Sequence, residues 1–156
     1  MADFRLRTDA EAWFSEIETS RHIRSKFDIY YFCLMMGFAS GRTNETKASG
    51  NTAKEIVGYF IDDYRPASRL LIGLLVTSEM RFRGIDASEK PAVRALFKEL
   101  IDAENGNHNL TDEGMKKMNA YASGGFDYLS ERRDCKPYHF EEFVRDYVEL
   151  IDEAVY

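Results

Sequence analysis

The sequence predicts an all-α fold, a single compact domain of six to eight helices that covers residues 1–156. Three observations lead to this prediction. Residues 27–39 read FDIYYFCLMMGFA, and every position after Asp28 is apolar, aromatic or glycine. Most other segments are amphipathic, with apolar residues at helical spacing. Only 3 prolines and 10 glycines interrupt the 156 residues, which favours long helices.

The apolar run predicts a central helix, over about residues 27–40, that neighbouring elements cover on all sides. A surface helix would carry polar residues along one face, and this run has none after Asp28. The run is shorter than the roughly 20 residues that cross a bilayer, so we expect burial in protein and no membrane contact. Ser25 and Asp28 have the spacing of a cap at its start.

The N-terminal part of the chain predicts a short extended arm followed by a helix. Phe4 and Leu6 alternate with two arginines, which is the pattern of an extended segment. Thr8 and Glu11 have the spacing of a capping box, which predicts a helix start. The apolar residues of this first helix recur at the helical interval: Ala10, Trp13, Phe14 and Ile17.

Residues 41–52 (GRTNETKASGNT) predict a mobile polar loop. They contain no apolar residue except Ala48 and are rich in residues that favour turns. A third helix is expected over residues 53–64, because one apolar stripe runs through this segment at helical spacing. That stripe consists of Ile56, Phe60 and Tyr64.

A fourth and a fifth helix are expected after Pro66, which suits the first turn of a helix. The fourth, over residues 69–82, contains the run LLIGLLV and is expected to be the second most buried element. The fifth, over residues 91–103, has the clearest amphipathic pattern in the chain. Its apolar residues are Val93, Leu96, Phe97, Leu100 and Ile101.

Two further helices are expected in the last third of the chain. Thr111 is a good N-cap for the first of them, and we expect Gly124-Gly125 to break or kink it. The second follows Pro137 and ends near the C-terminus of the sequence. Its apolar stripe consists of Phe140, Phe143, Val144, Tyr147, Ile151 and Ala154.

The net charge of −6 comes from the last third of the chain. Residues 101–156 hold 6 Lys or Arg and 13 Asp or Glu, whereas the two charge signs nearly balance in the first 100 residues. Such an acidic surface repels nucleic acid and suits a basic partner, or it serves only as a solvated surface. The N-terminus lacks the apolar core of a secretory signal, and the two cysteines form no disulfide framework, so we expect a cytoplasmic protein.

Two segments resemble known binding motifs only in part. Residues 110–132 follow the rhythm of a helix-turn-helix, but Lys116 stands where a small residue is needed, and the local charge is acidic. Residues 102–113 place three carboxylates at calcium-loop positions, but Gly106 stands at position 5 instead of the glycine that belongs at position 6. We therefore interpret the first segment as an ordinary capped helix and the second as an interhelical turn.

The sequence offers no complete catalytic or metal site. Cys135 and His139 have a CxxxH spacing, but no second Cys/His pair lies nearby to complete a zinc site. Cys33 lies between Phe32 and Leu34, which indicates an unreactive thiol in the core. We expect no cofactor and no metal. An enzyme remains an open alternative, because helical bundles build sites from scattered side chains.

Basic residues suggest one possible binding surface. Arg21, Arg24 and Lys26 precede the apolar run, and the polar loop could fold beside them to form a patch that contacts phosphates or an acidic partner. The loop and its edge supply three further cations: Arg42, Lys47 and Lys54.

The sequence therefore predicts a non-enzymatic helical interaction protein, an adaptor or accessory subunit of a larger intracellular protein assembly. Its partner would be another protein or a second copy of itself, bound through tyrosines and the last helix. The expected interface residues are Phe140, Phe143, Tyr147 and Ile151. The alternative is a nucleic-acid-associated subunit of a bacterial defence or DNA-processing complex that contacts phosphates through the basic segment.

Overall fold

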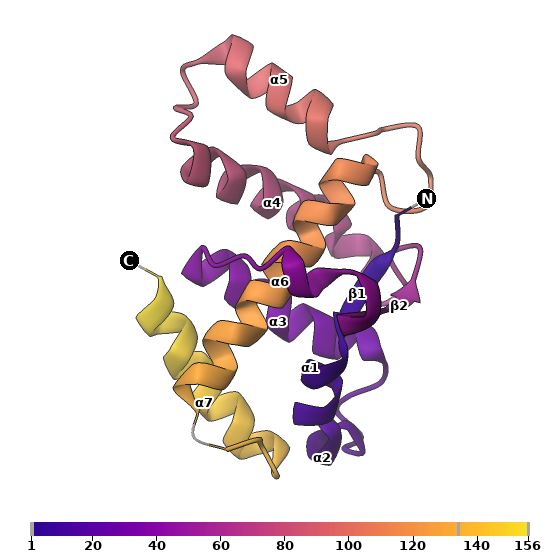
Figure 1. Ribbon diagram of the computed structural model, residues 1–156, viewed down its shortest axis with the longest axis vertical. Helices are drawn as coiled ribbons and strands as arrows, with labels where there is room; N and C mark the ends of the chain where they lie inside the picture. Colours follow the sequence, from indigo (N-terminus) through magenta and orange to yellow (C-terminus); the bar gives the residue numbers. More distant parts are fainter. Residues whose placement is uncertain (1, 134, 156) are drawn as a thin grey trace.

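Two long helices, α3 (Lys26–Ser40) and α6 (Asp112–Arg132), cross at the centre of the structure (Figure 1). The structure is a computed structural model and describes residues 2–133 and 135–155. Within these ranges the chain forms seven α-helices and one two-stranded sheet. The predicted fold class, a compact and predominantly helical domain, is confirmed.

Glycines bring the backbones of α3 and α6 into contact. A Cβ atom added at Gly37 would lie 2.0 Å from the carbonyl oxygen of Tyr121, and one added at Gly125 would lie 1.8 Å from that of Cys33. Both distances are too short for any real carbon atom, so only glycine fits at either position. The predicted break at Gly124-Gly125 is therefore wrong, because α6 continues through both residues and uses them for packing.

Burial is shared between these two helices. Eight residues of α3 are buried and the remaining ones are half-buried, so none of its side chains is exposed. Thirteen residues of α6 are buried, including the full stretch from Met118 to Phe126. The crossing pair therefore forms the centre of the core, and the other elements pack around it.

The N-terminal arm forms a strand that pairs with a second strand. β1 (Phe4–Arg7) lies antiparallel to β2 (Ala53–Val57), with Leu6 opposite Lys54. The third helix expected over residues 53–64 is therefore wrong. Phe4 and Leu6 are almost fully buried, and the backbone of their strand needs hydrogen-bond partners there, which β2 supplies. A short 3-10 helix, Arg65–Ala67, then leads into the next helix.

A buried arginine ties β1 to α6. The side chain of Arg7 is 4% exposed and donates to Asp9, at 2.5 Å, and to Asp127, at 2.6 Å. It also donates to the carbonyl oxygen of Ser123, at 3.2 Å, and its guanidinium lies over the ring of Phe126. Because a buried charge is costly without such partners, these contacts hold the strand against the helix.

The segment 41–52 lies across α6 (Figure 1) and contains two short 3-10 helices, Thr46–Ala48 and Gly50–Thr52. The backbone N–H of Asn44 donates to the carbonyl of Ala120, at 3.0 Å, and its side chain donates to Asp127, at 2.8 Å. The predicted mobility of this segment stays a prediction. These two hydrogen bonds show that α6 holds the segment at Asn44.

The remaining helices pack around the central pair or project from it. α1 (Thr8–Trp13), α2 (Ser15–Glu18) and α7 (Phe140–Ala154) lie at one end of the molecule. α4 (Ser68–Arg83) and α5 (Lys90–Leu100) form a hairpin that extends from the other end (Figure 1). In the described part of the chain, no helix is long and apolar enough to cross a bilayer.

The replacement Gly125→Ala should destabilise the protein by at least about 1–3 kcal/mol, because the new Cβ would force α3 and α6 apart. Chemical denaturation measures this change in the free energy of unfolding. Gly106→Ala is the matched control, since nothing lies within 4 Å of a Cβ added there, and it should stay within about 1 kcal/mol of the original. Equal stability of both variants would contradict the close backbone contact.

Candidate functional site

The α4–α5 hairpin, residues 68–100, is attached to the core through a chain of polar contacts. Glu79 of α4 is 2% exposed, and it accepts hydrogen bonds from the Tyr121 hydroxyl, at 2.7 Å, and from Arg83, at 3.0 Å. Arg83 also donates to Glu99 of α5, at 2.5 Å. These contacts join α6, α4 and α5 near the C-terminal ends of α4 and α5.

The surroundings of these groups support that chain of contacts. Burial raises the pKa of the Tyr121 hydroxyl, and its hydrogen bond to Glu79 raises the pKa further. The hydroxyl therefore keeps its proton and donates a hydrogen bond to the carboxylate. The hydrogen bond to Glu99 raises the pKa of Arg83 above its ordinary value. A buried carboxylate with two donors is a stable anchor, because its charge is paired and hydrogen-bonded.

Large apolar side chains on this hairpin are exposed. Leu70 is 65% exposed, Phe82 is 70% exposed and Phe97 is 47% exposed. The prediction that residues 69–82 form the second most buried helix is wrong along this face, and Phe97, expected to face inward, points to solvent. The core takes other residues of these helices instead: Leu71, Ile72, Leu75, Val76, Leu96 and Leu100.

These exposures could not be found from the sequence pattern. α4 has apolar residues around most of its circumference, and such a pattern is typical of a helix that is buried on all sides. Only the position of its neighbours decides which side faces solvent. The exposure of a Leu and a Phe on one helix can therefore be recognised only once the fold is known.

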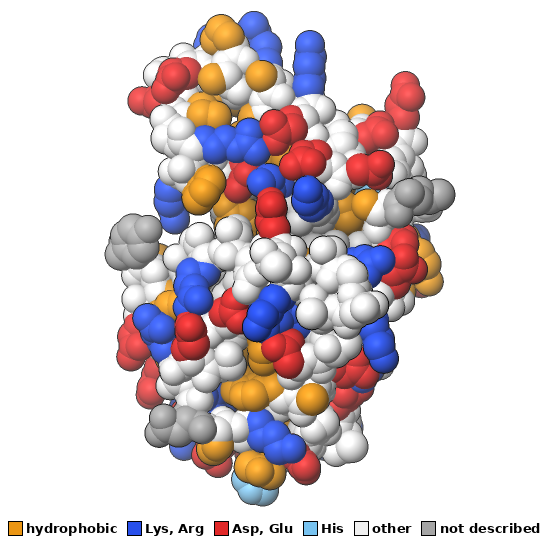
Figure 2. All heavy atoms as spheres, viewed as in Figure 1, with side chains coloured by type: hydrophobic (Ala, Val, Ile, Leu, Met, Phe, Trp, Pro, Cys, Tyr) orange, Lys and Arg blue, Asp and Glu red, His pale blue; other side chains and the backbone are white. Residues whose placement is uncertain are grey.

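The hairpin also differs from the rest of the chain in charge. Residues 68–100 contain six Lys or Arg and four Asp or Glu, a net charge of +2, whereas the other residues contain 15 and 23, a net charge of −8. Figure 2 shows apolar and basic side chains next to one another on the part of the surface that the hairpin forms. This surface is thus both apolar and cationic.

The structure does not gather the six basic residues expected from the sequence into one patch. Lys26 pairs with Glu11, at 3.1 Å, and Arg42 pairs with Glu131. Arg21 and Arg24 are exposed in the turn after α2, at one end of the molecule. The segment 41–52, with Arg42 and Lys47, crosses α6 near the middle (Figure 1), and Lys54 is exposed on β2. The six basic residues therefore form two separate groups.

The apolar stripe of α7 faces the protein's own core. Phe143 is fully buried and its ring packs against those of Phe14, at 5.4 Å between centroids, and Phe32, at 5.2 Å. The Tyr147 hydroxyl donates to the carbonyl oxygen of Phe32, at 2.6 Å. Phe140 and Ile151 are half-buried. A partner would reach Phe143 only if α7 left the bundle. In this fold, therefore, only the outer face of α7 is accessible to a partner.

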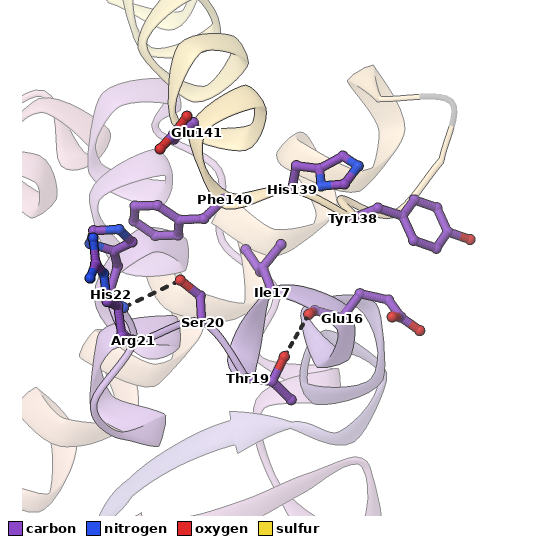
Figure 3. Close-up of a pocket in the computed structure, with 10 residues that line it drawn as sticks. All are labelled: Glu16, Ile17, Thr19, Ser20, Arg21, His22, Tyr138, His139, Phe140 and Glu141. Carbon is purple, nitrogen blue, oxygen red and sulfur yellow. Dashed lines mark hydrogen bonds between the residues drawn. The ribbon is translucent and has the colours of Figure 1, made fainter.

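An open cavity of about 490 Å³ lies between α2 and the start of α7 (Figure 3). The figure shows the ring of His22 against that of Phe140, and the two rings stack with 4.8 Å between their centroids, while the His139 side chain points away from them. The Ser20 hydroxyl accepts a hydrogen bond from the backbone N–H of His22, at 3.3 Å. It therefore contacts the His22 backbone and not its imidazole, so the two residues are not arranged as nucleophile and base. The other lining residues are Glu16, Ile17, Thr19, Arg21, Tyr138, His139 and Glu141.

The cysteines and carboxylates show no arrangement typical of catalysis or metal binding. Cys33 is 1% exposed, and burial raises the pKa of its thiol, as is usual for a structural cysteine. Cys135 is exposed. Among residues 2–133 and 135–155, no group of three or more His, Cys, Asp or Glu side chains could hold a metal ion. The sequence of this protein matches no protein-family model, and neither a curated protein nor a solved structure is detectably similar to it.

The replacement Tyr121→Phe should cost about 1–3 kcal/mol, because the buried Glu79 carboxylate would lose one of its donors. Thermal unfolding measures the change in stability. Tyr128→Phe is the matched control: Tyr128 is also a buried tyrosine of α6, but its hydroxyl makes no hydrogen bond to the described residues. Equal losses for both variants would show that the contact with Glu79 contributes nothing specific.

Proposed function

We propose that this protein is a non-enzymatic helical interaction protein, an adaptor or accessory subunit of a larger protein assembly. The observation that carries the proposal is the α4–α5 hairpin, which is tied to α6 through the hydrogen bond between Glu79 and Tyr121 and exposes Phe82 and Phe97. Exposed aromatic side chains on a rigid element are typical of protein interfaces, where aromatic residues supply much of the binding energy.

The charge of the hairpin supports the same proposal and narrows the partner. Arg94 and Lys98 of α5 are exposed and form no ion pair with a described residue. Such cations around an apolar centre favour a partner whose surface is acidic, since complementary charge speeds association and selects among partners. The rest of the chain, outside residues 68–100, carries excess negative charge and would repel the same partner. This repulsion directs binding to the hairpin.

We place this assembly in the cytoplasm. Cys33 and Cys135 are both free, which suits a reducing compartment. The buried thiol of Cys33 contributes to packing in the core and offers no means of covalent attachment to a partner.

Replacing both Phe82 and Phe97 by Ser should remove the partner without unfolding the protein. Surface substitutions usually change stability by no more than about 0.5 kcal/mol, whereas loss of two interface aromatics should weaken binding at least about tenfold. The measurement is quantitative mass spectrometry of proteins that the full chain retains from an extract of its own cells. Each retained protein is compared between the original chain and the double variant.

The matched control is Tyr138→Ser, because Tyr138 is 57% exposed but lies between α6 and α7, outside the hairpin. The control should retain the same proteins as the original chain. If the double variant also retains them all, the hairpin is not the contact surface. If the original chain retains nothing above background, the interaction function itself is contradicted.

A second candidate is a nucleic-acid-associated subunit of a bacterial defence or DNA-processing complex. The observation in its favour is a set of exposed cations that form no ion pair with any described residue: Arg21, Arg24, Lys47 and Lys54. Their separation into two groups and the overall charge of −6 weaken it, since phosphate binding depends on concentrated positive charge.

This second candidate predicts binding to a labelled DNA duplex or RNA strand that weakens steeply as salt rises. Replacing Arg21, Arg24, Lys47 and Lys54 by Glu should abolish that binding and flatten its salt dependence, while paired Lys26 and Arg42 stay intact. Fluorescence anisotropy at low ionic strength measures both effects. No binding by the original chain, even at low salt, excludes this candidate.

A further inference from the structure

The outer face of α5 carries a row of three cations. Lys90, Arg94 and Lys98 are all exposed, and each is four residues from the next. Four residues of an α-helix span about 6 Å, so the row is about 12 Å long. None of the three forms an ion pair with a described residue. Leu96 and Leu100, on the other side of α5, are buried, so the row faces away from the protein, and α5 itself lies at the outer end of the molecule (Figure 1).

The acidic residues of α4 and α5 do not neutralise this row. Each helix contains one, Glu79 in α4 and Glu99 in α5, and both accept hydrogen bonds from Arg83, at 3.0 Å and 2.5 Å. Glu99 also lies about 140° around α5 from Arg94, because successive helical residues are about 100° apart. The positive charge of the row is therefore left unpaired on the outer surface, and Figure 2 shows basic side chains at this end of the molecule.

The side chains beside the row leave room for a second helix. Pro91 and Ala95 form a parallel row of short, exposed side chains on one side of the cations. Phe97, which is 47% exposed, lies on the other side. Rows of residues four apart are the ridges that pack into the grooves of another helix, and short residues make such a groove. The shape of this face thus suits a helix, and Phe97 supplies an apolar contact.

Exposed acidic residues lie before and after the row in the chain. Asp86 and Glu89 precede it, and Asp102 and Glu104 follow it. A nucleic-acid strand that ran along α5 would carry its charge past both ends of the row and meet these carboxylates, which repel phosphates. A partner segment with only three carboxylates in a row would avoid them. The length of the row therefore favours a short acidic element over a long polyanion.

We propose that the outer face of α5 binds an acidic α-helix of the partner protein. Every fourth residue of that helix is Asp or Glu, and these carboxylates pair with Lys90, Arg94 and Lys98, since such a row repeats at the same interval of about 6 Å. An apolar side chain next to them covers Phe97. This binding mode rests on the proposed adaptor function and deepens it, because it specifies the secondary structure and the charge spacing of the partner segment.

Zero-length cross-linking tests this contact directly. A water-soluble carbodiimide joins a lysine amine to a carboxylate only where the two touch, and the full chain is treated with it in an extract of its own cells. Mass spectrometry should find Lys90 and Lys98 linked to two acidic residues of one partner protein that are about eight residues apart, because eight helical residues span the length of the row. An extended segment would span the same length in about four residues.

A charge-reversal variant supplies the second arm of the experiment. Lys90→Glu with Lys98→Glu should weaken retention of the linked protein at least about tenfold, since like charges then face one another. Lys116→Glu with Arg145→Glu is the matched control, because both residues are exposed, lie outside the hairpin and give the same change in charge. The control should retain the protein, and both variants should keep the original unfolding midpoint. Replacing the two linked acids of the partner by Lys should restore its binding to the α5 variant.

Four results would overturn the proposal, and they separate it from the adaptor function. Linked acids about four residues apart, or scattered through the partner, would show that no acidic helix lies along α5. Retention that nuclease treatment abolishes would show that the ligand is nucleic acid. If the α5 variant keeps the protein that Phe82→Ser with Phe97→Ser loses, the adaptor function stands and the row of cations is not the contact. If the original chain retains nothing, both proposals fail.

Discussion

The close crossing of α3 and α6 is the contact on which the other parts of the structure depend. At Gly37 and Gly125 the two backbones approach so closely that no side chain fits between them. Because dispersion forces weaken quickly with separation, this approach brings the flanking side chains of both helices into full contact. α6 then serves as the support for β1 through Arg7, for the segment 41–52 through Asn44, and for the hairpin through Tyr121.

Much of this fold could be predicted from local sequence, and the parts that could not depend on distant contacts. The buried run of α3, the cap at Thr111 and the stripe of α7 are local patterns, and each gave a helix in the expected place. Residues 53–57 became a strand because Phe4 and Leu6, about 50 residues earlier, needed a paired neighbour. Gly124-Gly125 looked like a helix breaker because no local pattern reveals which backbone will press against it.

The candidate sites were harder to predict than the fold, for a related reason. Sequence shows which residues are apolar or charged, but exposure decides whether they are available. Phe143 was expected at an interface and lies in the core, while Phe97 was expected in the core and lies at the surface. The sequence analysis grouped the basic residues by their order in the chain. The fold separates them, because Lys26 is the first residue of α3 and Arg42 comes just after its other end. Function is therefore best argued from surfaces, and one that stands out is that of the α4–α5 hairpin.

The positions of the two cysteines give this protein a built-in reporter of its own motions. Cys33 lies at the helix crossing, where its carbonyl touches Gly125, and its thiol is 1% exposed, whereas Cys135 is exposed between α6 and α7. A thiol-specific reagent will modify Cys135 at once and Cys33 only when the core around it opens. The ratio of the two labelling rates thus measures how often the core opens under native conditions. The same ratio, taken with a partner present, would show whether binding at the surface stabilises the core, without any mutation being introduced.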